Sequence, residues 1–161
     1  MDPISLLSPL RSLVRRVRLG GSAPAGHPEA DAPLSLPRRI DGPAAAAQLA
    51  ADLLRHRRED ITLAIYIDER HRLVGTAILA VGWGQAARLS ARPVLAGAMA
   101  SRATTCIIVR YGRCRGLSAM EQEQASFAAL AAACSRYGLV VADHLVVGGA
   151  GGFSSTRSSC S

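Results

Sequence analysis

Lysine is absent from this chain of 161 residues, and arginine supplies all 19 basic side chains. Such uniform usage is typical of codon bias, so a single arginine does not by itself indicate an anion site. Acidic side chains number only 12, which leaves a net charge of +7 and a pI near 10.2. This charge predicts a positive field that attracts nucleic acid, acidic proteins or anionic membrane, whatever the fold.

Aromatic residues, cysteine pairs and long apolar runs are also scarce. Aromatics make up 4% of the chain, and its four cysteines form no CxxC pair, which argues against a zinc finger or a disulfide scaffold and favours a reducing cytoplasm. The longest apolar runs, such as residues 73–81, fall short of the roughly 18 to 20 residues of a membrane span. The apolar fraction of 49% is nevertheless enough for one compact domain.

The first 20 residues carry the pattern of a basic amphipathic helix, with apolar side chains at helical spacing and arginines opposite them. We call this segment the docking arm. It could dock on another protein, lie on a membrane, touch nucleic acid or pack on its own domain, and the sequence leaves these alternatives open. Residues 21–42 are rich in proline and glycine and predict a linker. The docking arm is defined by Leu6, Leu10, Arg11, Leu13, Val14, Arg15, Arg16, Val17 and Arg18.

The compact domain is expected over residues 43–155, followed by a flexible tail over 156–161. Ser118 with Glu121 has the spacing of a capping box, and Gly138 supplies a helix stop. The order of elements predicts an α/β or α+β fold in which helices flank a mixed sheet. Helices are expected at 44–58, 90–101 and 118–137, and strands at 61–67, 73–81, 104–111, 139–147 and 153–155.

Four stretches of this region are similar to a known family. With them, residues 61–155 resemble the RadC branch of the JAB/MPN metalloprotein superfamily. The resemblance implies a JAB/MPN-like mixed sheet with a metal site at the end of its central strand. The stretches are residues 65–74, 91–98, 105–109 and 138–148, the last containing an Asp-His pair.

This sequence does not have the residue types of the family's metal-binding signature. The family has a His-x-His-Pro-Ser-Gly run, an aspartate about ten residues later and a glutamate from the second strand. Arg110 and Gly112 fall on the two histidines, Glu123 on the aspartate, and Thr76 or Ala77 on the glutamate. Guanidinium has no lone pair for a metal and glycine has no side chain. We therefore expect no catalytic residue, no metal and no cofactor, as in a pseudoenzyme.

Arginines gather where the family places its metal. Arg110, Tyr111, Arg113 and Arg115 predict a flexible loop that binds phosphate or the carboxylates of a partner, unless it is a solvated remnant of a decayed site. With no aromatic platform beyond Tyr111, sequence-specific readout of nucleic acid is not supported.

Asp143 and His144 are expected to be structural, with the carboxylate fixing the tautomer of the imidazole.

The main hypothesis is a non-catalytic RadC/JAB-like domain that acts as an interaction or scaffold subunit. It predicts another protein subunit as partner, leaves self-association open and disfavours a membrane surface. One alternative is a DNA-associated protein that binds the phosphate backbone without sequence specificity. Another is a residual hydrolase that depends on a metal or on Cys114 with His144.

Overall fold

The computed structural model describes residues 38–82, 89–112, 117–148 and 152–156, with residues 117–123 described as backbone. Within these ranges the helices and strands follow one another in the predicted order. None of the described helices combines the length and the apolar character that crossing a membrane requires. The elements are α1 (Pro43–Leu54), β1 (Ile61–Ile67), β2 (Leu73–Val81), α2 (Ala91–Ser101), β3 (Thr105–Gly112), α3 (Leu117–Ser135), β4 (Val140–Gly148) and β5 (Phe153–Ser155).

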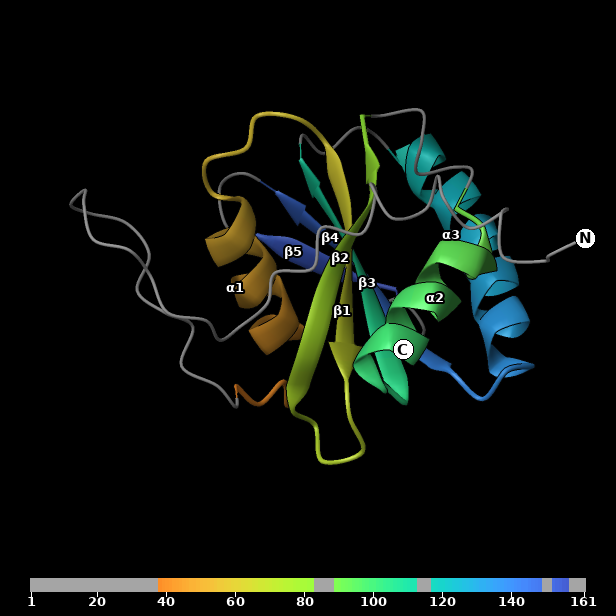
Figure 1. Cartoon of the computed structure of the whole chain (residues 1–161). Coiled ribbons are helices and arrows are strands. Elements are labelled where there is room, and N and C mark those ends of the chain that lie inside the picture. The colour runs from red at the N-terminus through yellow and green to blue at the C-terminus, as the bar shows by residue number, and fades with distance from the viewer. Residues whose placement is uncertain (1–37, 83–88, 113–116, 149–151, 157–161) are drawn as a thin grey trace, which may run out of the picture.

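The strands form one mixed five-stranded sheet in the order β2-β1-β3-β4-β5. β1 lies antiparallel to both β2 and β3, β3 and β4 run parallel, and β5 returns antiparallel to β4. Helix α1 covers one face of the sheet, and α2 and α3 cover the other (Figure 1). The predicted class, a mixed sheet flanked by helices, is confirmed.

Two apolar layers hold the helices to the sheet. On the α1 side, Leu49 packs with Ile65 and Val109, and all three side chains are fully buried. On the other side, Val94 of α2 and Cys134 of α3 pack with Ile108. Because β1 lies between both layers, all seven of its residues are buried. Alternating apolar and polar residues such as those of residues 61–67 are typical of a strand with one buried face, but here both faces are covered.

Several element boundaries also differ from the prediction. Helix α1 ends at Leu54, its last buried residue, because the following Arg and His side chains are exposed to solvent. Helix α3 begins at Leu117, so Ser118 lies inside its first turn and cannot be the predicted N-cap. Gly138 does end the helix region: its φ is +76°, and the next amide, Leu139 N–H, donates to the carbonyl of Cys134.

The folded region starts before the predicted boundary at Pro43. Ile40 is only 2% exposed and belongs to the α1-side core. Its N–H donates to the carbonyl of His71, and Leu73 N–H donates to the carbonyl of Arg38. These bonds attach the chain to the start of β2, so the last residues of the predicted linker are part of the domain. The docking arm and the rest of the linker lie outside the described residues.

Candidate functional site

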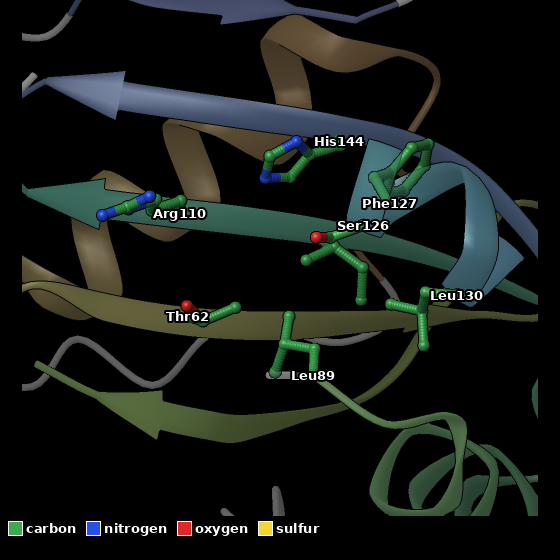
Figure 2. A pocket seen from close by; sticks show the side chains of 8 residues that line it. Thr62, Leu89, Arg110, Ser126, Phe127, Leu130 and His144 are labelled. Carbon is green, nitrogen blue, oxygen red and sulfur yellow. The ribbon is translucent and has the colours of Figure 1, made fainter. Parts of the chain in front are cut away.

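A small pocket lies under α3, on the sheet face that α2 and α3 cover (Figure 2). Thr62 of β1, Arg110 of β3 and His144 of β4 approach it from three neighbouring strands. The sheet register places Thr62 beside Arg110, and Ile108 beside His144. The cavity measures about 20 Å³, enough for about one water molecule. The remaining lining residues are Leu89, Ser126, Phe127 and Leu130.

Arg110 and Tyr111 belong to β3 and not to a flexible loop, so that part of the prediction is wrong. The ladder with β1 and β4 continues through this segment, and the two side chains are 6% and 9% exposed. Because neighbouring residues of a strand point to opposite faces, Arg110 lines the pocket while Tyr111 packs in the α1-side core. The two side chains therefore do not form one clamp. Arg113 and Arg115, like Cys114, lie outside the described residues.

Gly112 is the residue that the sequence comparison placed at the second histidine of the family signature, and its surroundings oppose a side chain. Its φ of +152° is a conformation that L side chains rarely adopt. A Cβ added there would collide with the carboxylate of Asp60. Asp60 precedes β1, whose first residue, Ile61, pairs with Tyr111. The sequence reasoning missed Asp60 because only this antiparallel register brings it against Gly112.

Ala77 and Glu123 are the positions expected for the family's glutamate and aspartate. At neither of them does the structure describe a carboxylate that reaches the pocket. Ala77 on β2 is buried on the same face and pairs with Ala64 of β1. The backbone of Glu123 lies in α3, and its side chain is outside the described part of the structure.

Zinc prefers imidazole, thiolate and carboxylate ligands, usually with three or more from the protein. The described part of the site offers a guanidinium at Arg110, no side chain at Gly112 and a methyl group at Ala77. Among the described residues, no group of three or more His, Cys, Asp or Glu side chains could hold a metal ion. The residues present therefore do not fit the zinc ion that the family resemblance implies.

His144 is the imidazole that lines the pocket beside Arg110, and its surroundings keep it neutral. The ring is 7% exposed and stacks on Phe127, with 5.3 Å between centroids and 20° between planes. Burial lowers the pKa of His144 to about 4, the Arg110 guanidinium acts in the same direction, and the Asp143 carboxylate opposes both. Nδ1 has no hydrogen-bond partner among the described residues. The ring is thus uncharged near neutral pH.

Asp143 is structural, but not in the predicted way. Its carboxylate accepts a hydrogen bond of 2.8 Å from the backbone N–H of His144, not from the imidazole. It also accepts from the Ser155 hydroxyl at 2.6 Å and the Thr156 hydroxyl at 3.2 Å. These bonds hold β5 beside β4 and include Thr156, the first residue of the predicted tail.

The family model of the RadC-like JAB domain matches residues 40–160, about three quarters of the chain. The chain belongs to the RadC-like JAB domain family. No curated protein matches it. The resemblance drawn from the sequence is thereby confirmed, and the matched region starts at Ile40, the buried residue at which the folded region attaches to β2.

In this RadC-like JAB domain, the end of the central strand β3 lies within one residue of the predicted position. The residues that surround this end were not predicted from the sequence. Thr62 and Phe127 line the pocket beside Arg110, and neither carried a sequence signal that set it apart from core residues. Thr62 lies on the less apolar side of an alternating strand, and Phe127 lies on a helix rich in alanine. The register of the sheet and the position of α3 are needed to place them.

Proposed function

We propose that this RadC-like JAB domain is non-catalytic and acts as an interaction or scaffold subunit. The observation that carries the proposal is the buried Arg110 in the pocket. Counting along the sequence aligns this arginine with the first metal-binding histidine of the family. A guanidinium stays charged at every physiological pH, so it repels a divalent cation and has no lone pair to donate. The Asp60 carboxylate against Gly112 leaves no space for the second imidazole.

Exposed apolar side chains support a role in binding other molecules. Met99 and Tyr137 are 80% and 75% exposed, and Val81, Val140 and Phe153 are also exposed. Large exposed apolar groups are typical of interaction surfaces when they gather in one place. The net charge of +7 favours acidic partners over basic ones.

Zinc binding by the full chain tests the proposal. After incubation with zinc and dialysis, we expect elemental analysis to find no stoichiometric metal, and thermal unfolding to be the same with zinc and with a chelator. The matched variant is Glu123→Gln, which removes the carboxylate aligned with the family's aspartate. Stoichiometric zinc that stabilises the wild type and is lost in Glu123→Gln would overturn the non-catalytic function.

Binding to the phosphate backbone of nucleic acid is a second candidate, because one observation favours it. The segment after α1 places Arg55, His56, Arg57 and Arg58 together, all exposed to solvent. Several guanidiniums in one exposed segment can contact neighbouring phosphates. If they do, affinity for a labelled DNA duplex should fall steeply with salt, and Arg57→Gln with Arg58→Gln should weaken binding and reduce the salt slope. No binding at low salt would exclude this candidate.

A further inference from the structure

A groove lies along α2, beside the turn that joins α3 to β4. Leu95 and Met99 of α2 form one side, and Tyr137 and Leu139 form the other. Its volume is about 820 Å³, far larger than the pocket under α3. α2 and α3 lie side by side on one face of the sheet (Figure 1). The lining residues place the groove along α2. It is a different place from the family's metal position.

The groove is apolar but open to solvent. Met99 and Tyr137 are the most exposed of the large apolar residues that the structure describes, and both line the groove. Leu139, which also lines it, is buried, and Leu95 is half-buried. An apolar surface of this kind gains free energy when a partner covers it, because the covered area is removed from water.

Two arginines lie at the two ends of the groove. Arg92 is in the first turn of α2 and Arg102 is its C-cap, and both line the groove. At about 1.5 Å per residue they are separated by roughly 15 Å along the helix axis. Within the described ranges, neither side chain makes a hydrogen bond or an ion pair. Two arginines without an ion-pair partner among the described residues therefore flank the apolar side chains of the groove.

The backbone at Arg102 is unusual for its position. Its φ is +56° in the left-handed region, and its N–H donates to the carbonyls of Ala98 and Met99. Glycine is the residue that normally ends a helix in this way, because a Cβ is strained in the left-handed region. The chain thus holds a guanidinium at the groove end where glycine would be less strained.

We propose that this groove binds an amphipathic helix of a partner protein, with its apolar side chains on Met99 and Tyr137 and its carboxylates on Arg92 and Arg102. The inference rests on the proposed interaction function and specifies its partner. Carboxylates about eleven positions apart, or three helical turns, match the separation of the two arginines. The positive charge of the groove disfavours this chain's own arginine-rich docking arm as the occupant.

A designed peptide tests the proposal on the full chain. The probe is a helix of about 18 residues, with leucines at helical spacing, a glutamate near each end of the apolar face and glutamine elsewhere. In ¹⁵N-labelled protein, the probe should shift the amide resonances of residues 91–103 and 137–139. Replacing its glutamates with lysine should abolish these shifts.

Variants assign the binding to particular side chains. Arg92→Gln with Arg102→Gln should lower the affinity for the probe about tenfold, because two exposed charge pairs are lost. Met99→Gln should weaken it about fivefold through loss of apolar contact. The matched control, Arg57→Gln with Arg58→Gln, removes the same charge elsewhere and should change the affinity less than about twofold. All these side chains are exposed, so the thermal midpoints should stay close to that of the wild type.

Three results would overturn the proposal: no shifts at the groove, equal binding of the lysine probe, or equal weakening by both arginine pairs. Stronger groove binding by a peptide of residues 1–20 would assign the groove to the docking arm and also overturn it. The zinc experiment separates this proposal from the proposed function. If the protein binds both zinc and the probe at the groove, only the non-catalytic function is refuted. If it binds neither zinc nor the probe, only the groove proposal is refuted.

Discussion

Asp143 and His144 are neighbours on β4, yet they point to opposite faces of the sheet and meet very different surroundings. On the α1 side, the Asp143 carboxylate accepts hydrogen bonds from the Ser155 and Thr156 hydroxyls and from a backbone N–H. On the α3 side, His144 is equally buried, but its Nδ1 lacks a partner among the described residues. The α1 side thus provides hydrogen-bond donors for its buried carboxylate, whereas the described residues of the α3 side provide no partner for Nδ1 of His144.

The α3 side buries polar groups that tight apolar packing alone does not require. A buried polar atom without a hydrogen bond costs about 1 to 3 kcal/mol, and a core selected only for stability would replace it with an apolar group. The α3 side also buries the Arg110 guanidinium and the Thr62 hydroxyl around the same small cavity. Among the described residues, the buried polar groups of the α3 side therefore gather around this cavity, where no cluster of metal-binding side chains is present.

The largest effect is expected on the well-packed face. Leu49→Ala removes a fully buried side chain of α1 and should lower the free energy of unfolding by about 4 kcal/mol, because it leaves a cavity in a dense layer. Urea unfolding measures the change. The half-buried Leu53 of the same helix is the control, and Leu53→Ala should cost about 1 kcal/mol. Equal costs for the two variants would show that the α1 layer is not tightly packed.

Acid should destabilise the protein through the opposite face. Because the pKa of His144 is lowered to about 4, the unfolded chain takes up this proton at higher pH than the folded chain does. The stability contributed by the neutral ring is present above the unfolded pKa of about 6.5 and is lost as the pH falls toward 4, by about 3 kcal/mol in all. His144→Phe cannot titrate, so the difference in unfolding free energy between wild type and variant should follow this window. A difference that does not change with pH would contradict the lowered pKa.

The fold could be predicted from local patterns, whereas the site depends on register. Alternation in residues 61–67 and the hydrophobic run at 73–81 were sufficient for the hairpin, because each strand carries its own signal. The position of Asp60 against Gly112 follows only when β1 pairs with β3. Arg110 and Tyr111 fall within the strand expected at 104–111, but they were also assigned to the flexible basic loop, and only the pairing with β1 and β4 decides for the strand.

Gly112→Ala tests whether the end of β3 has room for a side chain. Both the positive φ and the collision with Asp60 oppose a Cβ, and we expect a loss of about 2 kcal/mol in unfolding free energy. Gly138 is a matched control, because its φ is also positive but an added Cβ would meet nothing within 4 Å. Gly138→Ala should cost about 1 kcal/mol. If both variants lose the same stability, the Asp60 carboxylate does not fill the site.

The smallest changes in unfolding free energy are expected for two buried aromatic rings on the face that α2 and α3 cover. Tyr66 is 1% exposed, and its hydroxyl donates a hydrogen bond of 3.0 Å to the carbonyl of Val94. Tyr66→Phe should therefore cost about 1 kcal/mol, because the Val94 carbonyl loses its buried donor. His144→Phe removes a polar ring whose Nδ1 makes no hydrogen bond with the described residues, and it retains the stacking on Phe127, so at neutral pH it should raise the free energy of unfolding by up to about 1 kcal/mol. Thermal and urea unfolding measure both variants, and a larger loss for His144→Phe than for Tyr66→Phe would mean that a polar partner satisfies the imidazole in solution.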